Sequence, residues 1–199
     1  MIWSRGALLI HRFLASSAAN GPGTRSVIWT QGCSLGCPGC FNPETHSGDG
    51  GAFLTIDEIL HRLLKLGQSV EGLTITGGEP LQQMPGVLSL LQGIRRATRL
   101  STVLLTGYTL PEVRAMTGAD ELLGALDVLI AGRYQERHRV ARGLLGSQNK
   151  ALVCLTPRYS AADFAGVPEA ELVIDSSGTV ISTGIDPVML EARASGERR

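Results

Sequence analysis

Short apolar runs alternate with stretches of helical periodicity along most of this chain. Runs of branched and aromatic residues, bounded by turn residues, predict strands. We expect strands at residues 8–14, 26–30, 72–76, 101–106, 127–131 and 150–155. Apolar residues spaced three or four apart predict helices between them, at residues 55–67, 85–97, 111–116 and 120–125. This alternation favours a parallel sheet with right-handed crossovers, in which the first strand could lie at an edge.

The first of these helices has the clearest start signal. Thr55 stands at the cap position and Glu58 follows three residues later, which is the pattern of a capping box. The apolar residues of its stripe are Ile56, Ile59, Leu60, Leu63 and Leu64. We therefore expect a helix that begins at Thr55, ends at Gly67 and packs one apolar stripe on the sheet.

The chain length selects among parallel α/β folds. A closed eight-fold barrel takes about 250 residues, and this chain has 199. We predict an α/β fold of the open type, a partial parallel β/α barrel of five or six units. Residues 1–189 should form one domain, with a hairpin-like pair at 171–174 and 179–182 and a flexible tail at 190–199.

Charge and hydropathy exclude several function classes. Eighteen Lys and Arg balance eighteen Asp and Glu, so no overall basic field indicates binding to nucleic acid or to a membrane surface. No apolar run approaches the roughly 20 residues that span a bilayer, and no signal peptide is evident. We predict a cytoplasmic protein, in which clustered cysteines are more often metal ligands than disulfides.

Three of the four cysteines lie within eight positions, in a Gly- and Pro-rich loop after the second predicted strand. Cys33, Cys37 and Cys40 have the spacing C-x3-C-x2-C. Three thiolates are one short of a closed zinc site or a four-cysteine cluster, which suggests a metal centre with one position open. Two plainer alternatives remain: His46 could complete a zinc site, or Cys154 could complete an electron-transfer cluster. We expect instead a solvated loop position for His46 and a core position for Cys154.

A second motif, Thr76-Gly77-Gly78-Glu79-Pro80, follows the next predicted strand. The carboxyl ends of parallel strands meet at one edge of a sheet, where ligands bind. The two glycines would let a ligand approach bare backbone, and the carboxylate could receive an ammonium group. The motif alone is a common turn, but beside a three-cysteine loop it indicates a ligand site.

Together these motifs resemble a known family. Cys33, Cys37 and Cys40 match the CxxxCxxC signature of the radical S-adenosylmethionine (SAM) superfamily, and Gly77-Gly78-Glu79 matches its GGE motif. The chain is similar in particular to the activating enzymes of glycyl-radical enzymes such as anaerobic ribonucleotide reductase. This closer resemblance rests on residues 21–25, 31–43, 76–81, 106–108, 127–134 and 146–149.

The resemblance implies a [4Fe-4S] cluster bound through three irons by the three cysteines, with the fourth iron left for the amino and carboxylate groups of SAM. It assigns the SAM ammonium to Glu79 and to the backbone of Gly77 and Gly78. Four further contacts with SAM follow from it, at Gly39 and Phe41 on the adenine side and at Thr76 and Thr106 beside the cavity. Phe41 could equally be an ordinary buried aromatic, and the two threonines could simply end their strands.

The implied activity is reductive cleavage of SAM to a 5′-deoxyadenosyl radical, which takes hydrogen from a backbone glycine of a partner glycyl-radical enzyme. A flavodoxin or ferredoxin would supply the electron. One alternative is a small radical SAM enzyme acting on a small molecule or peptide, and another is a non-catalytic iron–sulfur or zinc module. The basic stretch at residues 133–142 could dock an acidic partner surface or form a solvated face.

Overall fold

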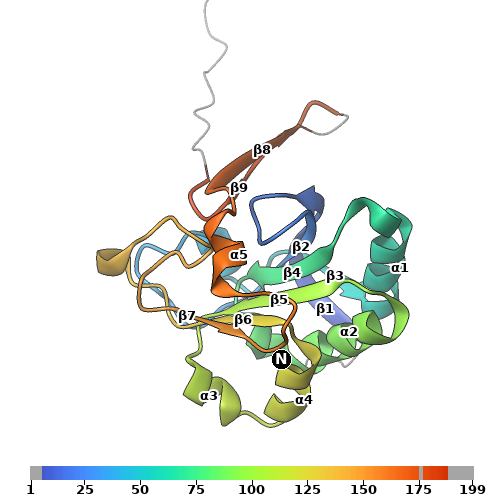
Figure 1. The fold of residues 1–199 in the computed structure, drawn as a ribbon, viewed down its shortest axis with the longest axis horizontal. Coiled ribbons are helices and arrows are strands. Elements are labelled where there is room, and N and C mark those ends of the chain that lie inside the picture. Colours follow the sequence, from blue (N-terminus) through green and yellow to red (C-terminus); the bar gives the residue numbers. More distant parts are fainter. Residues whose placement is uncertain (1–5, 175–176, 188–199) are drawn as a thin grey trace, which may run out of the picture.

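The computed structural model describes residues 6–174 and 177–187, and its centre is a seven-stranded sheet (Figure 1). The strand order is β3-β1-β2-β4-β5-β6-β7. The strands are β1 (Ala7–Ser17), β2 (Arg25–Thr30), β3 (Ala52–Thr55), β4 (Gly72–Gly77), β5 (Ser101–Thr106), β6 (Val128–Ala131) and β7 (Ala151–Cys154).

The middle of the sheet is parallel and its flanks are antiparallel. Strands β2, β4, β5 and β6 run parallel to one another. Strands β1 and β3 on one flank and β7 on the other pair antiparallel. The sheet stays open, because β3 and β7 end it rather than pair with each other. The expected α/β fold with an open parallel β/α arrangement is therefore confirmed, with antiparallel strands added at both edges.

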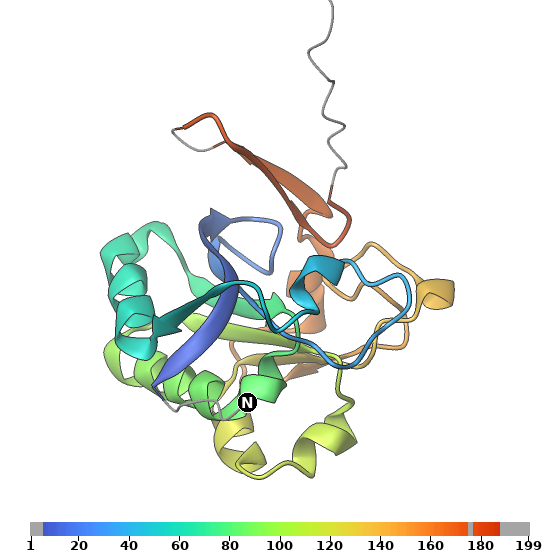
Figure 2. The same ribbon diagram turned by 180° about the vertical axis from the view of Figure 1, so that it is seen from behind.

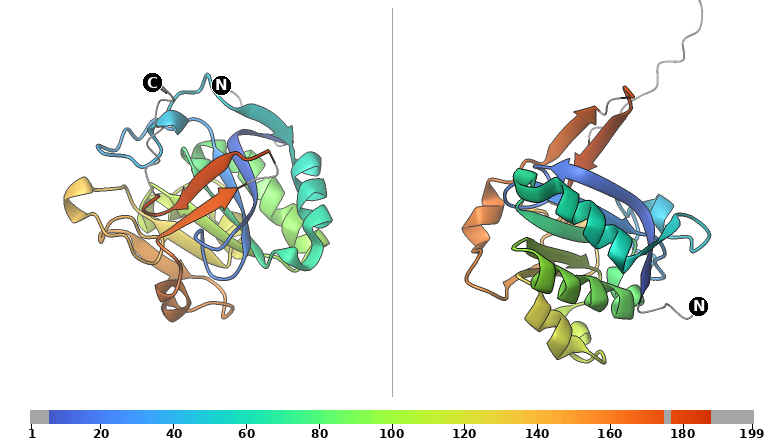
Figure 3. Two further views of the ribbon diagram at one scale, coloured as in Figure 1. Left: turned by 90° about the horizontal axis from the view of Figure 1, so that it is seen from above. Right: turned by 90° about the vertical axis from the view of Figure 1, so that its right-hand side faces the viewer.

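Helices cover one face of this sheet (Figure 3). They are α1 (Ile56–Leu66), α2 (Met84–Ala97), α3 (Leu110–Arg114) and α4 (Ala119–Ala125), with single 3-10 turns at Pro43–Thr45, Gly67–Ser69, Pro80–Gln83 and Glu136–His138. The expected capping box is present, because Thr55 accepts from the Glu58 amide and the Glu58 carboxylate accepts from the Thr55 amide. The main core lies between these helices and the sheet.

The opposite face of the sheet is covered by the C-terminal part of the chain (Figures 1 and 2). Helix α5 (Ala161–Ala165) packs Phe164 against Val103 and Val128, which makes a second, smaller core. A two-stranded sheet follows, β8 (Ala170–Ile174) with β9 (Val180–Gly184). The sequence predicted this hairpin but not helix α5. It did not predict where either of them lies relative to the large sheet.

Side-chain hydrogen bonds join the hairpin to the turn after β1. The Glu171 carboxylate accepts from the Ser17 hydroxyl at 2.6 Å and from the Ala18 amide at 2.8 Å. The Asn20 amide donates to the Thr183 hydroxyl at 2.9 Å. A pair of strands is at best marginally stable alone, so these contacts help to hold the hairpin against the body.

A fully buried guanidinium joins the amino ends of the central strands to the C-terminal segment. Arg25 begins β2 and donates to the Thr74 hydroxyl at 2.8 Å, the Leu73 carbonyl at 2.9 Å and the Ser101 hydroxyl at 2.9 Å. It also reaches the Tyr159 hydroxyl at 3.3 Å. A buried charge needs such partners, which explains why an arginine can occupy this interior position.

Two expectations are corrected by the structure, and a third concerns residues outside the described range. The first strand is not an edge, because β3 pairs outside it, Ala7 opposite Thr55. Cys154 is exposed rather than in the core, because it ends the edge strand β7, whose outer side has no neighbouring strand. The tail expected at residues 190–199 lies outside the described residues. No helix among those residues is both long and apolar enough to cross a bilayer.

Candidate active site

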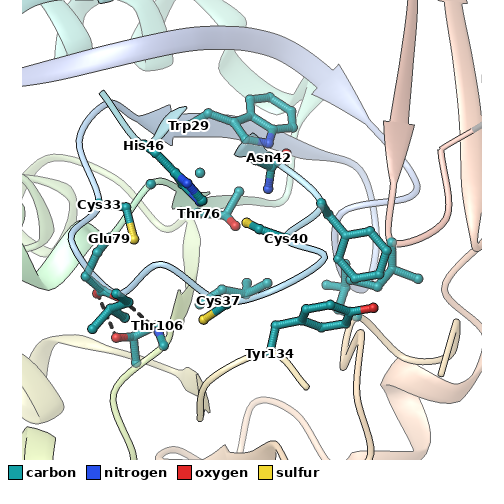
Figure 4. Close-up of a pocket in the computed structure, with 18 of the residues that line it drawn as sticks. Trp29, Cys33, Cys37, Cys40, Asn42, His46, Thr76, Glu79, Thr106 and Tyr134 are labelled. Atoms are coloured by element: carbon teal, nitrogen blue, oxygen red, sulfur yellow. Dashed lines mark hydrogen bonds between the residues drawn. The ribbon is translucent and has the colours of Figure 1, made fainter. Parts of the chain in front are cut away.

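A pocket lies where the parallel strands β2, β4 and β5 end (Figure 4). The cysteine loop forms one wall, the turn after β4 another, and the C-terminal segment after β9 contributes a third. The lining residues include Trp29, Cys33, Cys37, Cys40, Thr76, Gly77, Gly78, Glu79, Thr106 and Ile185. The structure thus brings the two sequence motifs together at one edge of the sheet.

Backbone hydrogen bonds fix both ends of the cysteine loop. The Gly32 amide donates to the Thr45 carbonyl at 2.8 Å, and the Cys33 amide donates to the His46 carbonyl at 3.0 Å. Gly39, just before Cys40, has a φ of +68°, a conformation that side chains disfavour. The loop is therefore a closed turn with a defined path, and its three thiols face the same pocket (Figure 4).

The glycines after β4 receive the backbone of the cysteine loop. The Gly78 amide donates to the Thr30 carbonyl at 2.8 Å, and the Glu79 amide donates to the Gly32 carbonyl at 2.9 Å. Gly77 has a φ of +100°, and a β-carbon there would lie 2.6 Å from the Thr30 nitrogen. The close approach is made by the chain's own backbone, whereas the sequence interpretation assigned it to a ligand. These glycines fix the distance between the two motifs.

Glu79 is almost fully buried, and three donors hold its carboxylate. Its Oε1 accepts from the Leu81 amide at 2.9 Å and from the Thr106 hydroxyl at 2.7 Å. Its Oε2 accepts from the Gly107 amide at 2.7 Å. Burial raises the pKa of Glu79, and the hydrogen bonds from Thr106, Gly107 and Leu81 oppose that rise. The carboxylate is held rigidly at the bottom of the pocket, across the ends of β4 and β5.

The three cysteines are a donor set that can hold an iron–sulfur cluster. All three are free thiols and partly buried, and burial raises the pKa of both Cys33 and Cys40. Within the described part of the chain, no three His, Cys, Asp or Glu side chains lie close enough together to hold one metal ion. Thiolates of a [4Fe-4S] cluster each bind a different iron, so they surround the centre rather than meet at one point. The donor set therefore suits a three-cysteine [4Fe-4S] cluster.

Comparison with known proteins identifies the family. A family model described as "4Fe-4S single cluster domain" matches residues 19–153. An anaerobic ribonucleoside-triphosphate reductase-activating protein from Enterobacteria phage T4 is 31% identical over 137 residues, which cover 67% of this chain and 85% of that protein. The protein of that name from Vibrio cholerae is 32% identical over 149 residues, covering 71% and 95%. This chain belongs to the radical SAM activating-protein family.

More distant relatives share only parts of this radical SAM activating protein. The pyruvate formate-lyase-activating enzyme of Clostridium pasteurianum is 38% identical over 97 residues, which cover 44% of this chain and 41% of that enzyme. Among solved structures, the crystal structure of QueE from Escherichia coli has a TM-score of 0.44 and 18% identity, covering 52% and 53%. That structural likeness is too distant to bear on function.

Family membership fixes the cofactors as a [4Fe-4S] cluster and SAM, and it makes the zinc alternative unnecessary. His46 is half-buried and lines the pocket between Cys33 and Cys40 instead of standing in solvent (Figure 4). Its backbone carbonyl accepts from the Cys33 amide, which fixes the backbone of His46 beside the cysteine loop. Cys154 does not line the pocket and cannot serve as a fourth ligand.

The residues expected at the adenine side separate in the structure. Phe41 lines the pocket and packs on Tyr134, with ring centroids 4.7 Å apart. Gly39 is exposed and is not among the lining residues. A β-carbon at Gly39 would lie 2.8 Å from the carboxyl carbon of Glu136, so the glycine makes room for a neighbouring loop. Of these two residues, Phe41 is among those that line the pocket.

The two threonines also have different surroundings. The Thr106 hydroxyl donates to Glu79 at 2.7 Å and accepts from the Tyr108 amide at 3.1 Å. Its position therefore orients the carboxylate. The Thr76 side chain lines the pocket and, among the described residues, its hydroxyl makes no hydrogen bond. It is therefore available to a ligand.

Sequence reasoning missed several pocket residues, of which Lys150 is the most informative. Lys150 precedes β7 and lines the pocket with Cys37, Cys40 and Glu79. Burial lowers the pKa of Lys150, and the negative charges of Cys37, Glu79 and Cys40 act in the opposite direction. The only sequence signal was its place at the end of the shared 146–149 segment, which says nothing about burial.

Two arginines of the expected basic run are engaged within the chain. Arg133 forms an ion pair with Glu112 at 2.7 Å and lies over the Tyr108 ring. Arg139 forms an ion pair with Asp186 and lies over the Phe41 ring. Both charges are paired with carboxylates of the chain, and both side chains stay about two-fifths exposed, which agrees with a solvated face at these two residues.

Proposed function

We propose that this protein activates a glycyl-radical enzyme, most specifically an anaerobic ribonucleotide reductase, by installing a backbone glycyl radical. One observation supports this proposal most directly. Three free thiols and the buried Glu79 carboxylate line one pocket, in a member of the activating-protein family. When bound, the reduced [4Fe-4S] cluster supplies the electron for cleavage of SAM to a 5′-deoxyadenosyl radical, which takes hydrogen from the substrate.

Cys33, Cys37 and Cys40 would hold the cluster, each thiolate on one iron. The cysteines must lose their protons to do so, which burial at Cys33 and Cys40 resists. The fixed loop path offsets this cost, because the ligands are already arranged around the pocket before the cluster binds.

Glu79 would accept the ammonium of SAM. An ionised carboxylate offers about four lone-pair positions, and protein donors use three of those on Glu79. One acceptor position therefore remains for the ammonium, close to the backbone of Gly77 and Gly78, which also line the pocket. A carboxylate so firmly held needs little reorganisation when the ligand arrives.

Two further contacts with SAM follow from the surroundings of each residue. The unpaired Thr76 hydroxyl would hydrogen-bond SAM, and the Phe41 ring would contact its adenine side. Thr106 would act through Glu79 rather than touch the ligand. Gly39 would allow the turn of the loop and make no ligand contact.

Apolar side chains would keep the reacting region dry. Leu35, Leu105, Leu144 and Ile185 line the pocket, together with the Tyr134 ring. Exclusion of water protects a reactive radical from side reactions. A flavodoxin or ferredoxin would deliver the electron, and we place the protein in the cytoplasm, where thiols stay reduced.

The test is anaerobic reconstitution with iron and sulfide, followed by reduction in the presence of SAM and a candidate partner. We expect 5′-deoxyadenosine by chromatography and a glycyl-radical signal of the partner by electron paramagnetic resonance. Formation of 5′-deoxyadenosine with no glycyl radical in any such partner would favour the small-molecule or peptide enzyme instead. No cleavage of SAM at all would leave only the non-catalytic module.

Matched cysteine variants give the control. Changing any one of Cys33, Cys37 and Cys40 to Ala should abolish the brown cluster absorbance and the cleavage of SAM. Cys154→Ala removes a thiol that lies outside the pocket and should change neither. Equal losses for all four variants would contradict the assignment of three ligands.

A further inference from the structure

Lys150 is the only Lys or Arg among the described residues that line the pocket. It shares that lining with Cys37, Cys40 and Glu79, and its charge acts on all three. Within the described part of the chain, its ammonium makes no hydrogen bond and no ion pair. Lys150 is half-buried, and a cation that is partly withdrawn from water without a partner in the protein is costly unless something in the pocket compensates it.

Neighbouring segments hold the backbone around Lys150. The Lys150 amide donates to the Ser147 carbonyl at 3.2 Å, and the next residue, Ala151, pairs with Ala131 at the start of β7. Gly132 packs against it, because a β-carbon there would lie 3.4 Å from the Lys150 Cα. The backbone of Lys150 is therefore fixed beside the pocket, which its side chain lines together with Cys37 and Cys40.

The charges around the pocket explain what a cation there would do. Three thiolates and the Glu79 carboxylate amount to four negative charges around one pocket. The nearby Arg133 and Arg139 are already paired with carboxylates. Reduction of a bound cluster adds one more negative charge. The thiolates and the Glu79 carboxylate repel that charge and so oppose reduction. The reduction potential of an iron–sulfur cluster depends on net charge and on its surroundings.

We propose that Lys150 raises the reduction potential of the bound cluster, by holding a positive charge on the side of it bound through Cys37 and Cys40. This inference rests on the proposed function, since it needs the cluster in the pocket. In this role Lys150 acts through its positive charge and does not bind iron. It makes the one-electron reduced state accessible to a biological donor.

The test is a redox titration of the reconstituted protein without SAM, followed by electron paramagnetic resonance of the reduced cluster. We expect a more negative midpoint for Lys150→Met, which keeps the length of the side chain and removes its charge. At the potential that half-reduces the wild type, the ratio of reduced to oxidised cluster should fall at least tenfold, equivalent to 59 mV for one electron. Lys150→Arg should restore the wild-type midpoint.

Lys65→Met is the matched control, because Lys65 is exposed on α1. It should leave the midpoint unchanged. An unchanged midpoint in Lys150→Met at equal iron content would overturn the proposal. So would a loss of SAM affinity without a change of potential, since Lys150 would then serve the ligand. If Lys150→Met fails to take up iron, Lys150→Gln is titrated instead and must show the same shift.

The two proposals fail differently. If the wild-type protein binds a cluster but does not cleave SAM, the proposed function fails while the titration remains decisive for Lys150. If the wild type cleaves SAM and the midpoint of Lys150→Met equals that of the wild type, only the inference about Lys150 fails.

Discussion

Replacing Glu79 by Gln removes one charge and one acceptor while keeping the shape of the side chain. The Glu79 carboxylate accepts from Leu81 and Thr106 through one oxygen and from Gly107 through the other. A glutamine has a single oxygen, so its amino group must face at least one of these donors. In the better orientation the glutamine oxygen keeps the hydrogen bonds from the Leu81 amide and the Thr106 hydroxyl. The glutamine amino group then faces the Gly107 amide, so that two donors meet.

The magnitude follows from these three bonds. A hydrogen bond to a charged group contributes about 1.5–3 kcal/mol, and a buried unsatisfied donor costs about 1–3 kcal/mol. A neutral side chain recovers part of the desolvation that raises the pKa of Glu79. We expect a net loss of about 2 kcal/mol in the free energy of unfolding, a substantial part of the 5–15 kcal/mol typical of a domain.

The assay is urea unfolding of the cluster-free protein, followed by circular dichroism. Thr106→Val is the matched variant, because it removes one donor and keeps the carboxylate. It should lose about 1–2 kcal/mol with an unchanged dependence on urea. In the reconstituted protein, Glu79→Gln should weaken SAM binding at least tenfold and Thr106→Val much less.

The pH dependence has a defined sign. Because the pKa of Glu79 is raised in the folded state, the part of the stability that depends on its protonation is complete below the unfolded pKa and is lost as the pH rises through the folded pKa. The hydrogen bonds from Leu81, Thr106 and Gly107 to the ionised carboxylate remain at neutral pH. Glu79→Gln should remove this loss. A variant as stable as the wild type at neutral pH, within about 0.5 kcal/mol, would refute the hydrogen-bonding scheme, because a surface substitution has effects of that size.

Three further predictions concern positions around the site. The hydrogen bond from Arg133 lowers the pKa of Glu112 to about 2, so its stabilisation should be lost as the pH falls from about 4.3 toward 2, and acid unfolding of Glu112→Gln should lack this component. Gly78→Ala should destabilise the protein and reduce cluster uptake measured by iron content, because a β-carbon there would collide with the backbone of the cysteine loop. Arg25→Met leaves buried acceptors without their donor and should cost at least about 1–3 kcal/mol in urea unfolding, whereas Tyr159→Phe, which removes one partner of Arg25, should cost about 1 kcal/mol.

Sequence patterns predicted the centre of the fold well. Strand β5 at Ser101–Thr106 matches its expected range, and β4 ends one residue beyond the expected 72–76. Both are short runs of apolar and β-branched residues, which is a local strand signal. The Thr55 capping box lies where its local signature predicted. These features depend on interactions within a few residues, which a sequence displays directly.

The edge strand β3 depends on distant pairing and was missed, whereas the edge strand β7 lies within its predicted range of 150–155. Strand β3 at Ala52–Thr55 is four residues long and forms only because Ala7–Ile10 of β1 lies beside it. Cys154 occupies an apolar run that predicts burial, yet its edge position exposes it. No local pattern says which strand ends a sheet.

The site shows the same division. The spacing of the cysteines and the GGE motif located the pocket, because both follow strands whose carboxyl ends meet at one edge. The partners of Glu79 and the burial of Lys150 depend on loops that return from 28 and 71 residues away in sequence, at Gly107 and Lys150. A local sequence pattern does not show which distant loops fold back against the site.

The exposed position of Cys154 has a practical consequence for handling the protein. A thiol reagent should find four reactive cysteines in the cluster-free protein and one in the loaded protein, because iron would protect the three in the pocket. A simple thiol count would therefore measure cluster loading without any spectroscopy of iron. The same surface thiol is free to link two chains in air, so Cys154→Ser is the better starting material for such measurements.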